Sequence, residues 1–201
     1  PLAAMAVQSI LAEAMAEFGP DAPSHISTLI IGGASVGAIL VDHPLVSLVS
    51  ATGSTAMGRI VGERVARRFG RSLLELGGNN ASIVAPSADL ELALRACAFG
   101  FMGTTGQRCT SLRRLFVHES RYDGFVSRLR SSSSSIAIGD PRHPETLLGP
   151  LIDEQAFQHM EFALAASRAA GGKVSGGERL IRDGVYVRPA IVELPLHEGP
   201  V

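Results

Sequence analysis

The sequence predicts an α/β protein built on a parallel sheet, and three observations lead to this class. Apolar segments of strand length alternate with segments of helical period up to residue 76. Glycine-rich turns follow several of the predicted strands, as at the strand ends where α/β sheets bind ligands. With 46% hydrophobic residues in 201, the chain can build a core in one large domain or two small ones.

Composition excludes several classes of partner. A net charge of −1 gives no reason to expect nucleic acid or an acidic membrane. No apolar run reaches the roughly 18–20 residues that cross a bilayer, so no membrane partner is expected. The six histidines and two cysteines have no metal-ligand spacing, which predicts no metal site and a reducing, cytoplasmic setting.

Both ends of the chain suggest a piece of a longer protein. Pro1 is not an initiator methionine and leads directly into a helical pattern. Val201 follows a segment with no closing element. We therefore expect a fragment, and we expect it to be inactive by itself.

The first elements follow from periodicity and turn residues. Residues 2–18 have the 3- and 4-residue apolar spacing of a helix, which 19–23 end with glycine and proline. Residues 25–31 are rich in β-branched residues and predict a strand, and 32–37 turn into a helix that ends near Asp42. This order resembles a dinucleotide-binding unit, but the middle glycine of G-x-G-x-x-G is replaced by alanine, so the motif by itself favours a plain tight turn before a helix.

A second strand, glycine turn and helix follow. Residues 45–51 predict a strand buried on both faces, and 52–58 lead into a helix that ends near Phe69. Ser54 or Thr55 is a natural N-cap. Free N–H groups at such a helix start attract an anion such as a pyrophosphate, but this motif taken in isolation favours an ordinary capped helix.

Residues 71–76 predict a further strand, which ends in Gly77 and Gly78. Gly37, Gly53 and Glu75 therefore fall at or just after predicted strand ends. A carboxylate at a strand end beside a glycine turn is a candidate general base.

The remaining elements follow from the same patterns. We predict strands over 79–86, over 113–117 and at 174, helices from a Ser87 cap, over 122–138 and over 153–170, and an extended segment over 186–192. The serine run 131–135 has the composition of a linker, but apolar residues keep a helical spacing across it, which favours a helix held by packing.

The two cysteines have opposite contexts. Cys97 lies on the apolar stripe of a predicted helix, which indicates a buried core thiol. Cys109 lies among small and polar residues beside Arg108, a context typical of a reactive thiol.

Four motifs together resemble the aldehyde dehydrogenase superfamily. They are Thr-Gly-Ser-Thr-Ala-Met-Gly at 52–58, Leu-Glu-Leu-Gly-Gly-Asn-Asn at 74–80, Gly-Gln-Arg-Cys at 106–109 and Gly-Pro at 149–150. Within the superfamily, residues 75–80 and 106–120 look most like the antiquitin branch. That branch oxidises α-aminoadipic semialdehyde, an intermediate of lysine catabolism.

The resemblance implies an architecture and a cofactor. Residues 1–76 would be the C-terminal part of a Rossmann-like NAD-binding domain, and residues 77–201 the N-terminal part of an α/β catalytic domain. NAD is the implied cofactor, with NADP not excluded, and the parent protein is expected to form a homo-oligomer. The partner is a small-molecule aldehyde.

The resemblance also implies a role for individual residues. Cys109 would be the nucleophile and Glu75 the base that activates water. The implied cofactor-binding residues are Gly37, Ala38, Gly53, Ser54, Thr55, Gly58, Glu75 and Leu76. Arg108 would hold a substrate carboxylate, and Thr110 would border the aldehyde.

One residue departs from the family pattern, and two alternatives stay open. Ala51 replaces the phenylalanine usual before Thr-Gly-Ser, which removes an aromatic contact near the cofactor helix. The alternatives are a related semialdehyde or betaine-aldehyde dehydrogenase, and a non-catalytic relative that keeps the fold.

Overall fold

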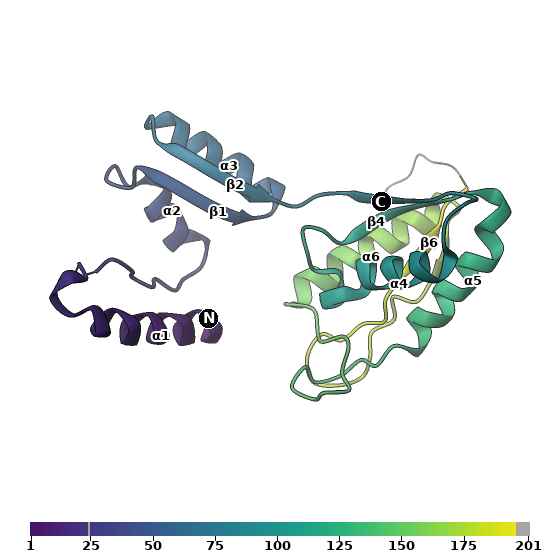
Figure 1. Ribbon diagram of the computed structural model, residues 1–201. Helices are drawn as coiled ribbons and strands as arrows, with labels where there is room; N and C mark the ends of the chain where they lie inside the picture. The colour runs from purple at the N-terminus through teal and green to yellow at the C-terminus, as the bar shows by residue number, and fades with distance from the viewer. Residues whose placement is uncertain (24, 196–201) are drawn as a thin grey trace. The chain divides into compact units, whose positions relative to one another are not determined.

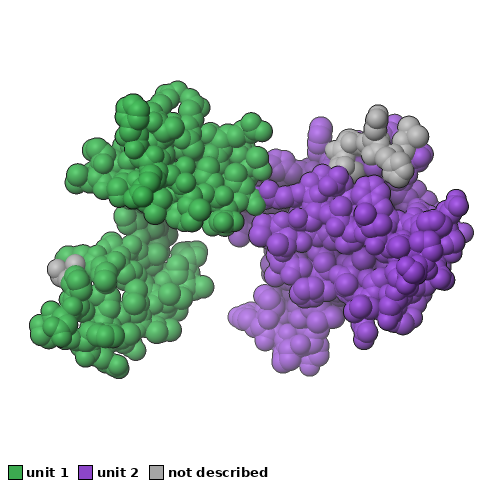
Figure 2. Space-filling model, turned by 45° about the horizontal axis from the view of Figure 1, so that its top comes forward, with its two compact units in different colours: residues 1–76 green, residues 77–201 purple. Residues whose placement is uncertain are grey.

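The computed structural model describes residues 1–23 and 25–195. The chain divides into two compact units, Pro1–Leu76 and Gly77–Val201 (Figure 2). Each unit mixes helices with strands, in agreement with the predicted α/β class (Figure 1).

The first unit contains two strands that pair in parallel, as predicted, and helices beside them. Residues at the ends of β1 and β2 pair in register, so that Thr52 lies opposite Glu75 and Gly53 opposite Leu76. The elements of this unit are α1 (Leu2–Phe18), η1 (Gly19–Asp21), α2 (Ala34–Asp42), β1 (Leu48–Gly53), α3 (Thr55–Arg67) and β2 (Arg71–Leu76).

Helices α2 and α3 form the core of this unit together with the sheet. Val41 of α2 packs with Val61 and Val65 of α3, and Val65 is only 1% exposed. Polar contacts join the same two helices, since Arg64 pairs with Asp42 and the Arg68 guanidinium donates to the Val41 carbonyl. The packing fixes α3 along β2 and so places the start of α3 beside the strand ends (Figure 1).

Two predictions for this unit were wrong. Residues 25–31 form no strand; their backbone pairs with no described strand, and β-branched composition alone does not make one. Strand β1 is a strand but is not buried on both faces, because its only described neighbour is β2 and most of its side chains are exposed.

The N-terminal helix corrects a further expectation. By length and composition, Leu2–Asp21 could cross a membrane, with a mean hydropathy of 1.2 over its most apolar window. This finding corrects the prediction that no apolar run is long enough to cross a bilayer. Core helices of globular proteins have the same length and composition, so this measure alone does not assign α1 to a membrane.

Up to residue 195, the second unit contains two small sheets and three long helices. Strands β3 and β4 pair in parallel, and β5 pairs with β6 antiparallel. The elements of this unit are β3 (Asn80–Val84), α4 (Leu90–Met102), η2 (Gly103–Gly106), β4 (Leu112–Val117), α5 (Glu119–Ser135), α6 (Glu154–Ala169), β5 (Lys173–Ser175) and β6 (Ile191–Glu193).

The core of the second unit forms where α4 and α5 pack on β3 and β4. Its buried members are Val84, Cys97, Phe125 and Leu129. They come from three elements far apart in sequence, so their contact holds the unit together. Because α4 ends and β4 begins on either side of Cys109, this core also fixes both ends of the cysteine loop.

Helix ends differ from the predictions in detail. Asp89, not Ser87, caps α4 by accepting from the backbone N–H groups of Glu91 and Leu92. The serine run is helical, as favoured by its apolar spacing, and Ser133 is buried in it. Serine hydroxyls in this run donate to carbonyls three or four residues earlier, which satisfies them within the helix.

The buried loop residue Leu148 leads to a stability prediction. Its side chain is 1% exposed, whereas that of its neighbour Leu147 is 67% exposed. Leu148→Ala should lower the free energy of unfolding by about 2–5 kcal/mol, because it leaves a cavity. Leu147→Ala, the matched control, should change it by no more than about 0.5 kcal/mol. Urea denaturation checks both, and equal effects would contradict the packing described here.

Candidate active site

The predicted nucleophile lies in a loop of unusual backbone conformation. The loop connects α4 to β4 and begins at Gly103. Thr104 and Thr105 have positive φ angles of 53° and 57°, and Gly106 follows at 69°. For a β-branched residue this conformation costs about 1–3 kcal/mol, so the surroundings must hold it in place.

Side chains on the N-terminal side of Cys109 anchor the loop to the segment 149–152. The Thr105 hydroxyl donates to the Gly149 carbonyl at 3.0 Å. The Gln107 amide donates to the carbonyls of Thr104 and Pro150, each at 3.2 Å. Its oxygen accepts from the Ile152 N–H at 2.9 Å.

On the C-terminal side, Asn80 of β3 holds the loop. Its Nδ2 donates to the Cys109 carbonyl at 2.7 Å and to the Ser111 carbonyl at 3.1 Å. A β-bulge between β3 and β4 begins at Asn80, where Arg113 has no partner in the register. A Cβ on Gly78 would lie 3.4 Å from the Cys109 carbonyl, which places this turn beside the loop.

The structure confirms the contrast between the two thiols. Cys97 is 5% exposed in the core, and burial raises the pKa of its thiol. Cys109 is exposed. Only the second thiol can therefore meet a substrate from solution.

The placement of Arg108 does not support its predicted role. Its guanidinium donates to the Phe99 carbonyl at 2.9 Å and lies over the Phe99 ring at 4.6 Å. It thus attaches the loop to α4, and its role at a substrate carboxylate stays a prediction. Thr110, the other predicted substrate contact, is exposed next to Cys109.

The first unit brings six of the predicted cofactor residues together. Gly53 and Leu76 are paired at the strand ends, and Glu75 precedes Leu76 with an exposed side chain. Ser54 caps α3 by accepting from the Met57 N–H, as predicted. A Cβ on Gly58 would lie 2.5 Å from a methyl carbon of Leu76, so in this arrangement the Leu76 side chain occupies the space beside the glycine.

The start of α3 can accept an anion. Gly53, Ser54 and Thr55 are exposed, and the first N–H groups of the helix follow them. Gly37 and Ala38 lie apart from this group in sequence, in the first half of α2, the helix that packs on α3 through Val41. The exposed start of α3 fits a pyrophosphate, and the small residues of α2 leave room for the rest of a dinucleotide.

Sequence reasoning missed Asn80 and Gln107 as functional candidates. Glu75 belongs to the first unit, and Cys109 with its anchoring residues belongs to the second. The sequence identified Asn80 only as a member of the motif that contains Glu75, and Gln107 only as a polar neighbour of Cys109. Their place inside these two motifs was the available signal.

In the part of the chain that the structure describes, no group of three metal-ligating side chains is found.

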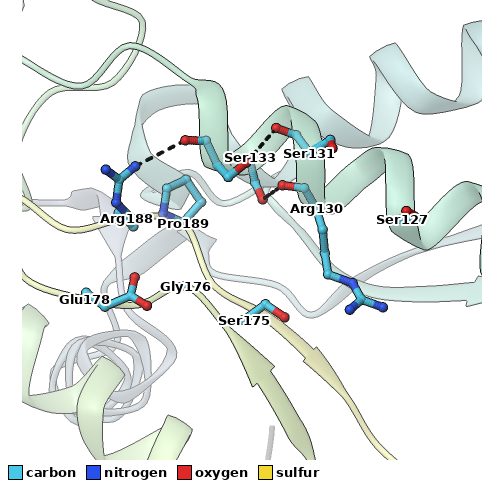
Figure 3. Close-up of a pocket in the computed structure, with 10 residues that line it drawn as sticks. Ser127, Arg130, Ser131, Ser133, Ser175, Gly176, Glu178, Arg188 and Pro189 are labelled. Atoms are coloured by element: carbon cyan, nitrogen blue, oxygen red, sulfur yellow. Dashed lines mark hydrogen bonds between the residues drawn. The ribbon is translucent and has the colours of Figure 1, made fainter.

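The second unit also has a hollow, which lies away from the Cys109 loop. It has a volume of about 470 Å³ and lies between the end of α5 and the segment 175–189 (Figure 3). Arg188 donates to the Ser134 carbonyl at 3.2 Å on one side of it, and Arg130 and Glu178 add opposite charges. No predicted catalytic or binding residue lines it, so it is not the candidate site.

Comparison with known proteins gives consistent matches. The family model described as "Aldehyde dehydrogenase family" matches residues 1–198. The chain is 42% identical to the alpha-aminoadipic semialdehyde dehydrogenase of Mus musculus, covering 100% of this chain and 37% of that protein. It is 40% identical to aldehyde dehydrogenase family 7 member A1 of Pisum sativum, covering 96% of this chain and 38% of that protein. The chain therefore spans less than two fifths of these relatives.

Solved structures agree with this match. Lactaldehyde dehydrogenase from Escherichia coli is similar with a TM-score of 0.78 and 33% identity, over 82% of this chain and 35% of that one. A betaine aldehyde dehydrogenase from Staphylococcus aureus in complex with NAD+ is similar with a TM-score of 0.78 and 31% identity, over 82% of this chain and 34% of that one.

Proposed function

Because this chain belongs to the aldehyde dehydrogenase family, we propose that the protein carrying it oxidises an aldehyde to a carboxylic acid with NAD as acceptor. One observation carries the proposal for this chain. Its exposed thiol, Cys109, lies in a strained loop held by side chains on both sides.

Cys109 acts as the nucleophile in this proposal. Its thiolate forms a bond to the carbonyl carbon, and the carbonyl electrons move to the oxygen. The backbone N–H of Cys109 donates to that oxyanion. Bound NAD supplies a hydride acceptor. Loss of hydride from the thiohemiacetal leaves a thioester on Cys109.

Glu75 releases the product. Its carboxylate takes a proton from water, the resulting hydroxide adds to the thioester carbon, and the Cys109 thiolate departs. The exposed carboxylate at the end of β2, beside Gly77, suits a base that must meet water.

Residues of the first unit bind NAD in this proposal. The start of α3 receives the pyrophosphate, with Gly53, Ser54 and Thr55 leaving its N–H groups accessible. Leu76 borders the nicotinamide, and small residues of α2 line the adenine side. NAD in the solved Staphylococcus aureus relative supports the choice of cofactor.

We propose α-aminoadipic semialdehyde as the aldehyde. The 42% identity to the mouse enzyme of that name supports it, against 31% to a betaine aldehyde dehydrogenase. Arg108 gives it no support, since its guanidinium is engaged by Phe99. The substrate proposal therefore depends on the relatives and not on a visible carboxylate clamp.

A panel of aldehydes tests the proposal in the full-length protein that carries this chain. Formation of NADH is followed with aminoadipic semialdehyde, betaine aldehyde and lactaldehyde, each with NAD and with NADP. We expect kcat/KM to be highest for aminoadipic semialdehyde with NAD, by about tenfold or more, or about 1.4 kcal/mol. A higher value for betaine aldehyde would support the related dehydrogenase instead. No NADH with any aldehyde would support a non-catalytic relative.

A further inference from the structure

We propose that Asn80 and Gln107 are positioning residues that hold the Cys109 loop from its two sides. The proposal rests on the proposed function, because a cysteine needs fixed geometry only if it reacts. One amide lies outside the loop and the other belongs to it. Asn80 comes from β3, and Gln107 attaches the loop to the segment 149–152.

Asn80 determines the direction of two peptide groups. Its amide nitrogen carries two hydrogens, and both are used, on the carbonyls of Cys109 and Ser111. When the Cys109 carbonyl is held, the following peptide plane cannot rotate, and the direction of the Cys109 backbone is restricted. A side chain without a donor at this position would leave both carbonyls free to turn.

Gln107 satisfies a demand that other side chains do not meet. Its amide nitrogen donates to the carbonyls of Pro150 and Thr104, the second of which also accepts from the Gln107 backbone N–H, and its oxygen accepts from the Ile152 N–H. An amide offers two donors on one atom and an acceptor on the other, whereas a carboxylate offers only acceptors. The contacts therefore also determine which way the amide is turned.

The backbone just before Gln107 needs holding. Thr104 and Thr105 are strained by their positive φ angles, and the loop would relax if its anchors were lost. Both amides are exposed, so water can replace part of their hydrogen bonding. Removing either one should loosen the loop without unfolding the core.

Alanine variants of the full-length protein test the proposal. Asn80→Ala and Gln107→Ala are compared with the control Ser82→Ala, which changes the next polar side chain of β3. We expect amide hydrogen exchange in residues 103–111 to rise about five- to tenfold in the two variants. We expect kcat to fall by about ten- to a hundredfold with little change in KM. The reason is that a loosened loop no longer holds the Cys109 sulfur at the position from which it attacks the aldehyde carbon. Ser82→Ala should match the wild type in both.

Two results would overturn the proposal. One is unchanged loop exchange in both variants, and the other is faster exchange with unchanged kcat. Labelling of the buried Cys97 by iodoacetamide identifies a variant that has not folded. For such a variant, Asn80→Asp or Gln107→Glu keeps the side-chain volume and repeats the test.

The failure of the proposed function is distinguishable from the failure of this proposal. A wild-type protein that forms no NADH with any aldehyde refutes the function. Loop exchange and the rate of Cys109 labelling by iodoacetamide are still measurable in that protein. Equal values in wild type and variants would then overturn the holding of the loop by the two amides.

Discussion

Replacing Cys109 by alanine is expected to lower dehydrogenase turnover of the full-length protein by at least about 10⁴-fold. Alanine has no atom that can form the thiohemiacetal, and a water molecule in its place is a far weaker nucleophile. Cys109 is an exposed thiol held in a structured loop, so the loss should affect chemistry and not folding. Initial rates of NADH formation at saturating aldehyde measure the effect.

The second cysteine supplies the control for this experiment. Cys97→Ala removes the other thiol of the chain, from the core of the second unit. It should retain turnover within about a factor of a few at a temperature where the protein is folded, at a modest cost in stability. Melting temperatures identify any loss of fold. Turnover retained by Cys109→Ala would refute the nucleophile assignment.

Replacing Glu75 by glutamine is expected to separate the two halves of the reaction. Acylation of Cys109 does not need the carboxylate, but hydrolysis of the thioester does. The variant should therefore release a rapid burst of about one NADH per site and then turn over about 10²–10⁴-fold more slowly than the wild type. Rapid-mixing measurements of NADH show the burst, and the mass of the intact protein shows the trapped acyl group.

A matched substitution tests whether the charge at this position matters. Glu63→Gln makes the same change in the first unit, where Glu63 forms an exposed pair with Arg67 on α3. It should leave both the burst and the steady state unchanged, since such pairs contribute only a few tenths of a kcal/mol. A linear time course for Glu75→Gln at the wild-type rate would exclude Glu75 as the base.

Local patterns predicted much of the fold because its cause is local. Strand β2 has the bounds 71–76 that its apolar run indicates, and α1 has the bounds 2–18. Ser54 caps α3 where a cap was expected, because the capping side chain and its N–H partner are three residues apart. The stripe that contains Cys97 similarly predicted its burial.

The failures involve partners outside the local sequence. Residues 25–31 have strand-like composition, but a strand exists only beside another strand, and none of the described strands pairs with them. The N-cap of α4 was predicted at Ser87 but lies at Asp89. Both residue types are good N-caps, and the path of the backbone decides which of them caps the helix. The contact between Arg108 and Phe99 likewise depends on how the loop folds back on α4, which the local sequence does not show, and the substrate role of Arg108 stays a prediction.

The sequence by itself determined the α/β class, most of the elements, the distinction between the two thiols and the resemblance to the aldehyde dehydrogenases. Only the tertiary structure showed that Asn80 and Gln107 anchor the Cys109 loop, and that Arg108 turns toward Phe99. The physical reason is that these side chains bind backbone carbonyls. Every residue has a backbone carbonyl, so the sequence does not show which carbonyl a distant side chain binds.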